Sequence, residues 1–179
     1  MRVGYPALPV LLTATCLFGA TGVAQEVKKE TVAGIRNLAR LETTVACAGA
    51  ITTEAIPEIK KMGFASIVNL RVATEAGADV EKQEAAAKAV GLNYFHVPFA
   101  GKPDPAAAEA FLNAITTKGA EPAFIHCGGG NRAATMWLIK RIAVDHWPVE
   151  RATAEASALG QTNPELRQFA IDYGTAHKR

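Results

Sequence analysis

Cysteine is scarce in this chain of 179 residues, which contains only Cys16, Cys47 and Cys127. Three cysteines are too few for a fold built on disulfides, and their spacing from the four histidines does not resemble a zinc site. We therefore expect no metal and no other cofactor. An excess of one charge is also lacking, since 19 Lys and Arg face 17 Asp and Glu. Without a basic cluster, the sequence does not predict a nucleic-acid partner.

Long apolar runs are lacking as well, apart from one near the N-terminus. Residues 7–23 are mainly apolar, but Gly and Thr interrupt them and the run is too short to cross a bilayer comfortably. Arg2 precedes the run, and small residues ending in Ala24 follow it. This pattern predicts a signal peptide over 1–24 that is cleaved near Ala24. The mature protein would then be periplasmic or secreted and would keep no membrane span.

The rest of the chain predicts one domain over 42–179, preceded by a mobile or helical lead-in segment over 25–41. Short apolar runs alternate with stretches that have helix caps or glycine stops, which favours an α/β fold. We expect a small, mainly parallel sheet of about four strands flanked by helices. The expected strands are 43–46, 65–70, 92–97 and 123–125. The expected helices are 52–62, 79–90, 104–117 and 131–144, with two more beginning near Pro148 and Pro164.

The motif HCGGGNR, residues 126–132, is the strongest indication of function in the sequence. It follows a buried strand and opens a helix, so it lies at the carboxyl end of the sheet, where ligands of α/β proteins bind. The unpaired N–H groups at a helix N-terminus attract anions, and glycines allow the backbone to turn these groups inward. The positive surroundings favour the thiolate, which is the nucleophilic form of cysteine. The motif therefore predicts that Cys127 attacks a small anion, so that we expect a small anionic or phosphorylated substrate.

This motif resembles the signature of cysteine phosphatases. Together with SIVNLR (66–71) and GLNYFHVP (91–98), it is similar to the phosphatase-like domain of beta-lactamase-hydrolase-like proteins. The resemblance implies the fold of dual-specificity phosphatases and a phosphatase-like hydrolase that cleaves a phosphate monoester through a phosphocysteine. It implies that Cys127 is the nucleophile and that Arg132 clamps the transferred group. It also implies that backbone amides bind the substrate, from Gly128, Gly129, Gly130, Asn131 and Arg132.

Two departures from the phosphatase pattern keep other functions open. Four residues separate Cys127 from Arg132, whereas ordinary tyrosine and dual-specificity phosphatases have five. Four is also the spacing in rhodanese-type sulfurtransferases, so a sulfurtransferase with a persulfide on Cys127 is an alternative. Ala133 stands where phosphatases usually have a Ser or Thr that assists hydrolysis. A further alternative is therefore a catalytically weak module that binds an anion or a phosphoprotein.

Asp104 and Arg71 are the next candidates. Phosphoester cleavage normally needs a proton donor, and Asp104 is the only carboxylate in the loop after the third expected strand. Its competing role is the N-cap of a helix with Pro105 in first position. Arg71, at the end of the second expected strand, is predicted either to bind substrate anions or to pair with Glu75.

His126 and Cys47 complete the set of candidates. We expect His126 to support the loop through a hydrogen bond rather than to act as a base. Cys47 is predicted to be either a small buried residue at a strand end or the partner of Cys127 in a reversible disulfide. Such a disulfide would protect a reactive thiolate in an oxidising compartment.

Overall fold

The structure is a computed structural model that describes Met1, residues 26–42 and residues 44–179. The signal peptide expected over 1–24 and its cleavage site therefore lie outside the described residues, apart from Met1. In the described part of the chain, no helix is both long and apolar enough to cross a membrane.

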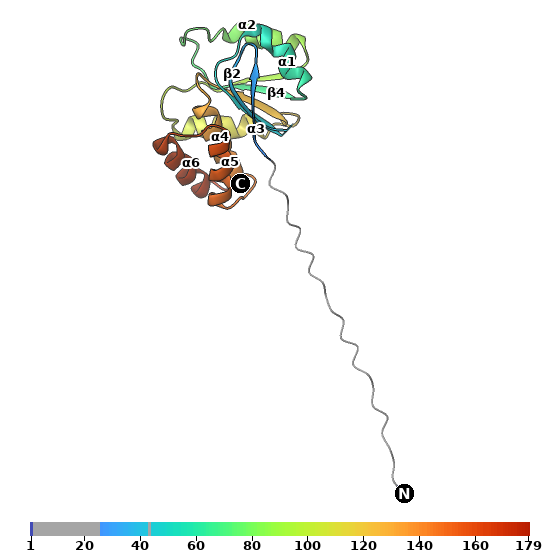
Figure 1. Cartoon of the computed structure of the whole chain (residues 1–179). Helices are drawn as coiled ribbons and strands as arrows, with labels where there is room; N and C mark the ends of the chain where they lie inside the picture. The colour runs from blue at the N-terminus through green and yellow to red at the C-terminus, as the bar shows by residue number, and fades with distance from the viewer. Residues whose placement is uncertain (2–25, 43) are drawn as a thin grey trace.

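A mixed sheet of six strands forms the centre of the fold, in the order β1-β2-β3-β6-β4-β5 (Figure 1). Neighbouring strands among β3, β6, β4 and β5 run parallel, whereas β1 and β2 are antiparallel to their neighbours. The α/β prediction is confirmed, but the sheet has six strands and not about four. The strands are β1 (Lys28–Val32), β2 (Ile35–Leu41), β3 (Val45–Ala48), β4 (Ser66–Asn69), β5 (Asn93–His96) and β6 (Ala123–His126).

The two additional strands come from the segment expected to be a lead-in. Residues 25–41 were predicted to be mobile or helical, and this prediction is wrong, because β1 and β2 form a hairpin that extends the sheet. The hairpin lacks the alternation of a regular strand pair. Its register shifts between Glu30 and Val32, and Asn37 within β2 has a positive φ of 50°. These irregularities break the period of two on which strand prediction depends.

Helices cover both faces of the sheet (Figure 1). On one face, α1 and α2 contribute to a core with β3, β4 and β6, and on the other, α3, α4, α5 and α6 contribute to a larger core. The helices are the 3-10 turn η1 (Thr53–Ala55), α1 (Ile56–Lys61), α2 (Val80–Ala89), α3 (Pro105–Ile115), α4 (Asn131–Ala143), α5 (Val149–Ala158) and α6 (Pro164–Ala176).

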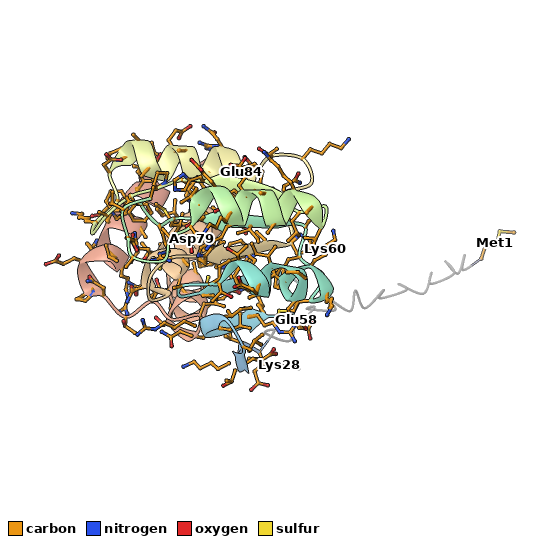
Figure 2. All side chains as sticks on the ribbon, turned by 90° about the horizontal axis from the view of Figure 1, so that it is seen from above. Met1, Lys28, Glu58, Lys60, Asp79 and Glu84 are labelled. Carbon is orange, nitrogen blue, oxygen red and sulfur yellow. The ribbon has the colours of Figure 1, made fainter. Side chains whose placement is uncertain are left out.

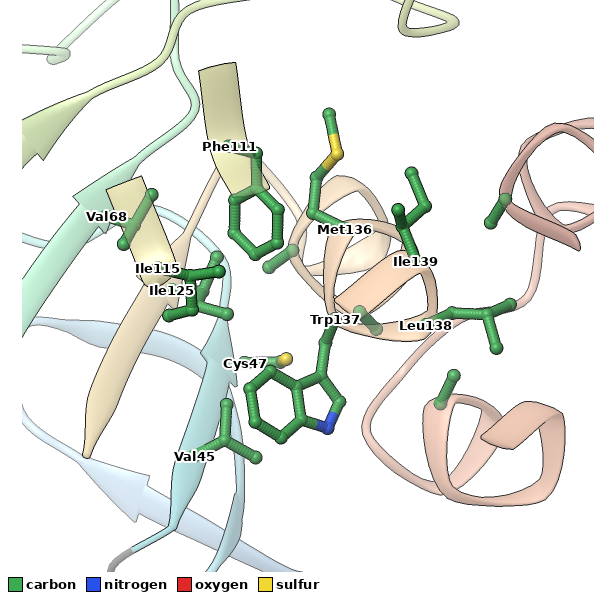
Figure 3. Packing of buried hydrophobic residues seen from close by; sticks show 14 of the residues in the cluster. Val45, Cys47, Val68, Phe111, Ile115, Ile125, Met136, Trp137, Leu138 and Ile139 are labelled. Carbon is green, nitrogen blue, oxygen red and sulfur yellow. The ribbon is translucent and has the colours of Figure 1, made fainter. Parts of the chain in front are cut away.

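The larger core surrounds α4, in which eleven of thirteen residues are buried. Trp137 projects from this helix toward the sheet, where its ring lies beside Val45 and Cys47 (Figure 3). Its indole N–H donates to Glu155 of α5 at 2.7 Å, so the buried polar atom is paired. Charged side chains such as Glu58 and Lys60 project from the outside of the molecule (Figure 2). Burial of α4 fixes the position of the loop that precedes it.

The parallel strands direct their carboxyl ends to one edge of the sheet. The segments that leave β4, β5 and β6 therefore meet there: residues 70–79 after β4, residues 97–104 after β5, and the loop 127–130 after β6. This convergence brings together residues that are up to 62 positions apart in the sequence.

Candidate active site

Cys127 lies at the end of β6, at the bottom of the loop that leads into α4. The residue is 1% exposed, and its backbone N–H donates to the carbonyl of Ala48 in β3 at 3.1 Å. The backbone N–H of Gly130 donates to the Cys127 sulfur at 3.1 Å. A hydrogen bond of this kind stabilises a thiolate more than a thiol, because the sulfur carries the negative charge that the donor faces.

Contacts outside the loop fix the direction of its peptide groups. The carbonyl of Gly128 accepts from the Ala50 N–H at 3.1 Å, and the carbonyl of Gly129 accepts from the Asn37 side-chain amide at 3.0 Å. Because a trans peptide points its N–H away from its C=O, the N–H groups of Gly129 and Gly130 face away from these contacts, and that of Gly130 reaches the sulfur. The loop is therefore a concave set of amide donors that can bind an anion.

One glycine of the loop is required by its backbone conformation, and a second lies close to charged side chains. Gly130 is the N-cap of α4 and has φ +106°, a conformation that residues with a side chain rarely adopt. At Gly128, an added Cβ would lie 3.3 Å from a Glu75 carboxylate oxygen and 3.4 Å from the Arg132 guanidinium. The loop thus turns sharply at Gly130 and is closely approached by charged groups at Gly128.

Arg132, in the first turn of α4, connects the three segments at this edge of the sheet. One terminal nitrogen, Nη1, donates to the backbone carbonyls of Leu70 and Phe99. The other, Nη2, contacts both carboxylate oxygens of Glu75 at 2.8 and 2.9 Å. The guanidinium is therefore held in one orientation beside the loop, as a clamp for an anion requires.

Glu75 belongs to this site although its sequence position predicted only a pair with Arg71. Its carboxylate contacts Arg132, and it also accepts from Arg71 Nε at 3.2 Å and from the Val72 N–H at 3.2 Å. Partial burial pushes the pKa of Glu75 upward, but hydrogen bonds from Arg132 and Arg71 outweigh that effect and lower the pKa below its ordinary value. Glu75 is thus an anion bound next to the loop, close to the place where a substrate anion would bind.

Arg71 pairs with Glu75 and is not directed at the loop. The other guanidinium nitrogens of Arg71 donate to the carbonyls of Gly77 at 2.7 Å and Ala76 at 2.6 Å. With 4% of the residue exposed, Arg71 holds the segment 72–77 in place. Of the two predicted roles, the structure shows the Glu75 pair, and the assignment of Arg71 as a substrate-binding residue is not supported.

Asp104 caps α3, as one of its two predicted roles required. Its carboxylate accepts from the Ala107 N–H at 2.7 Å, and Pro105 follows at the first helical position. Asp104 lines a hollow of about 490 Å³ together with His96 and Pro98. A different hollow, of about 520 Å³, contains Arg132 and Glu75. Asp104 therefore does not line the hollow that contains Arg132.

His126 differs from the expectation that it supports the loop through a hydrogen bond. It is fully buried, and neither ring nitrogen has a hydrogen-bond partner. Burial is the main cause that lowers the pKa of His126 to about 3, and the positive charges of Arg71 and Arg132 add to it. The imidazole is thus neutral and packs beneath the loop without holding it. Neighbouring backbone and Asn37 perform the supporting role.

The backbone of Asn131 continues the loop into α4, and its side chain contacts the turn between α5 and α6. The side-chain amide donates to the Thr162 hydroxyl at 2.6 Å, in the turn between α5 and α6. The N-terminal turn of α4 is thereby tied to the segment that follows α5. Ala133, which stands where phosphatases usually have a Ser or Thr, is fully buried.

Cys47 is a small buried residue at a strand end, which was one of the two roles predicted for it. It is fully buried and free, as is Cys127, so the two form no disulfide in this structure. Burial raises the pKa of the Cys47 thiol well above its ordinary value, and the nearby Cys127 and Glu155 raise it further. Among the described residues, no group of three His, Cys, Asp or Glu side chains is arranged to bind a metal.

Glu75 and Asn37 were missed for different reasons. Glu75 follows Arg71 by four positions, and the sequence indicates only a local surface pair, because the contact with Arg132 spans 57 positions. Asn37 lies in the segment whose strands were not predicted. The strand also contains Arg36 and Arg40, so the polar side chain of Asn37 does not stand out in the sequence.

Comparison with known proteins agrees with this geometry. Residues 37–144 match the family described as beta-lactamase hydrolase-like protein, phosphatase-like domain. The beta-lactamase hydrolase-like protein of Agrobacterium fabrum (strain C58) is 35% identical over 105 residues, which make up 56% of this chain and 24% of that relative. This chain therefore matches about a quarter of the relative's length.

Solved structures share the fold at lower sequence identity. A candidate phosphatase of Neisseria meningitidis z2491, nma1982, has a TM-score of 0.61 at 20% identity, covering 75% of this chain and 96% of its own. TpbA of P. aeruginosa, in complex with pTyr, has a TM-score of 0.60 at 16% identity, covering 87% and 91%. The fold is thus that of cysteine-phosphatase-like proteins. With the match over 37–144, this chain belongs to the family of the phosphatase-like domain of beta-lactamase hydrolase-like proteins.

Proposed function

We propose that this protein is a cysteine-dependent phosphatase that cleaves phosphate monoesters through a phosphocysteine intermediate. The observation that carries the proposal is the hydrogen bond of 3.1 Å from the Gly130 N–H to the Cys127 sulfur, in the loop that opens α4. Arg132 is fixed next to that loop by its contacts with Leu70, Phe99 and Glu75. The family match and the fold of TpbA, which was solved with pTyr, support the same reaction class.

The first step is attack of the Cys127 thiolate on the phosphorus atom. The new bond joins sulfur to phosphorus, and the bond from phosphorus to the leaving oxygen breaks. The amides of Gly129 and Gly130 and the guanidinium of Arg132 stabilise the charge on the remaining phosphoryl oxygens. Because these donors are already oriented, little reorganisation is needed as the charge develops.

The second step returns the enzyme to its starting state. A water molecule attacks the phosphorus of the phosphocysteine, the bond from sulfur to phosphorus breaks, and the electron pair returns to Cys127. The Gly130 N–H then stabilises the thiolate again. Ala133 provides no hydroxyl to assist this departure, so we propose that hydrolysis of the phosphocysteine limits turnover.

Two features favour the sulfurtransferase alternative: the loop length and the capping role of Asp104, because sulfur transfer needs no acid. The loop amides and Arg132 could also hold a thiosulfate-type anion, but the family match and the similar solved structures are those of phosphatase-like proteins. The third alternative, an anion-binding module, uses the same loop without turnover. The experiment below tests both against the phosphatase.

The test measures phosphate release from p-nitrophenyl phosphate by the wild-type protein, Cys127→Ser and Cys47→Ala. We expect release by the wild type and by Cys47→Ala, and loss of release in Cys127→Ser. Rapid acid quenching should trap phosphate on the peptide that contains Cys127. Equal background rates in wild type and Cys127→Ser would refute the proposal. So would thiocyanate formation from thiosulfate and cyanide without phosphate release, or binding of vanadate without turnover.

A further inference from the structure

The departure of an alkoxide or phenolate from phosphorus normally needs a proton from the enzyme. A donor must lie within hydrogen-bond reach of the leaving oxygen and must hold its proton at the working pH. The candidates for this donor are the titratable groups around the Arg132 hollow. They belong to the three segments that meet at the carboxyl edge of the sheet and to the start of α6.

Asp104 is occupied elsewhere. Its carboxylate is bound at 2.7 Å to the N–H of Ala107 and lies in the hollow that contains His96. His96 itself has its Nε2 2.8 Å from the carbonyl of Arg71. Asp104 would have to give up this cap to reach Arg132, and the cap stabilises the start of α3.

Glu75 and His126 lie closer to the loop, but neither holds a proton to give. Glu75 is bound by two arginines, which lower the pKa of its carboxyl and keep it ionised. His126 is neutral, with a pKa of about 3. Its ring is fully buried and has no surface exposed to the hollow. Glu75 therefore has no proton to transfer, and His126 does not reach the hollow.

Two charged side chains at the rim complete the hollow. Glu165 lies in the first turn of α6 and is exposed to water. Lys102 lies in the loop between β5 and α3, and lines both this hollow and that of Asp104. Its ammonium is also 5.7 Å from the centre of the Phe169 ring, which places it on the side of α6. The loop between β5 and α3, which was expected to supply Asp104 as an acid, thus contributes the Lys102 cation to the Arg132 hollow.

On the basis of the proposed function, we infer that the preferred substrates are phosphoryl compounds whose leaving group departs unprotonated as a stable anion, which Lys102 binds. A phosphoanhydride has this chemistry, because its leaving group is itself a phosphate. The Cys127 sulfur bonds to the terminal phosphorus, the bridging P–O bond breaks, and the electron pair remains on the departing phosphate. No proton is transferred in this step, and water later hydrolyses the phosphocysteine.

The test compares three substrates that differ in the basicity of the leaving group: inorganic pyrophosphate, p-nitrophenyl phosphate and phenyl phosphate. For the wild-type protein, kcat/KM should be lowest for phenyl phosphate, by about 100-fold or more relative to p-nitrophenyl phosphate, since general acid catalysis usually contributes about 10²–10⁴-fold. Asp104→Asn and Glu165→Gln should leave this ratio unchanged. Release of phosphate from pyrophosphate should be detectable and should be absent in Cys127→Ser.

Lys102 has its own test and a matched control. Lys102→Ala should lower kcat/KM for pyrophosphate about tenfold and for p-nitrophenyl phosphate less than threefold. The reason is that the leaving group of pyrophosphate, a phosphate, carries several negative charges, whereas p-nitrophenolate carries one. Lys118→Ala, an exposed lysine in the turn after α3, should change neither value. Equal effects of Lys102→Ala on both substrates would refute the role of Lys102.

Failure of the inference can be separated from failure of the proposed function. If phenyl phosphate and p-nitrophenyl phosphate are cleaved at similar rates, and Asp104→Asn or Glu165→Gln slows only phenyl phosphate, an enzyme acid exists and the inference is wrong. The dependence on Cys127 would then still support the phosphatase. If no substrate is cleaved above the Cys127→Ser background, the proposed function itself fails.

Discussion

Replacement of Glu75 tests whether its carboxylate both supports Arg132 and competes with substrate anions. Glu75→Gln keeps the size of the side chain and one acceptor oxygen, removes its charge, and replaces the other acceptor with an amide donor. Without that negative charge beside Arg132, inorganic phosphate should bind more tightly. A difference of about 1.4 kcal/mol corresponds to a tenfold change in affinity, and we expect a change of roughly this size.

Glu75→Ala removes the support as well as the charge. The carboxylate makes contacts of 2.8 and 2.9 Å with Arg132 and 3.2 Å with Arg71. Hydrogen bonds between charged groups contribute about 1.5–3 kcal/mol each, but exposed ion pairs contribute less than about 1 kcal/mol. With the Glu75 side chain 25% exposed, we expect a loss of about 2 kcal/mol. This corresponds to a fall of roughly 4–8 °C in the melting temperature.

The assays are calorimetric titration with phosphate and thermal unfolding, with Glu58→Gln as the control. Glu58 pairs with Lys61 at 3.1 Å, and both side chains are well exposed, so that variant should match the wild type. Unchanged phosphate affinity in Glu75→Gln would show that Glu75 does not compete for Arg132. An unchanged melting temperature in Glu75→Ala would show that the ion pairs add nothing to stability.

The pH dependence of the Glu75 contribution has a defined sign. The pKa of Glu75 is lowered in the folded protein, so its contribution to stability is fully present above the ordinary carboxyl value of about 4.3. It is lost as the pH falls through the lower folded value. The difference in unfolding free energy between wild type and Glu75→Gln, measured with urea, should therefore be present at neutral pH and vanish in strong acid. A difference that persists in strong acid would contradict this account.

Three further predictions concern the loop and the buried thiol. Asn37→Ala removes the hydrogen bond to the Gly129 carbonyl, and phosphate affinity measured by titration should fall about fivefold, equivalent to about 1 kcal/mol. Gly130→Ala places a side chain at φ +106°, so thermal unfolding should show a loss of about 1–3 kcal/mol together with reduced phosphate release. Cys47, fully buried and with a raised pKa, should resist iodoacetamide until the protein is unfolded, as peptide mapping would show. Rapid alkylation of Cys47 in the folded protein would contradict its burial.

The sequence allowed the parallel part of the fold to be predicted because its signals are local. The four strands β3, β4, β5 and β6 are short apolar runs between glycine and cap residues, and the predicted helices fall within a few residues of those observed. The cap at Asp104 was predicted from the Pro that follows it. The position of Cys127 between a strand and a helix followed from the same kind of local pattern.

The features that were not predicted depend on contacts between distant parts of the chain. Arg71 was equally compatible with a surface pair or an anion site, and only the tertiary structure shows that its donors are used by residues 75–77. His126 was expected to form a hydrogen bond, but the packing beneath the loop leaves it without a partner. Burial and long-range pairing of this kind leave no periodic signal in the sequence.

The hairpin of β1 and β2 has a practical consequence for work on this family. The family match begins at residue 37, inside β2, so a protein truncated at that boundary would lose β1 and the first residues of its partner strand. The shortened β2 would then be an exposed edge with unpaired backbone groups, which favours association between sheets. Asn37 would become a chain terminus instead of an anchored strand residue. A recombinant fragment with that boundary is therefore expected to aggregate and to hold its loop poorly, and inactivity of such a fragment would say little about the intact enzyme.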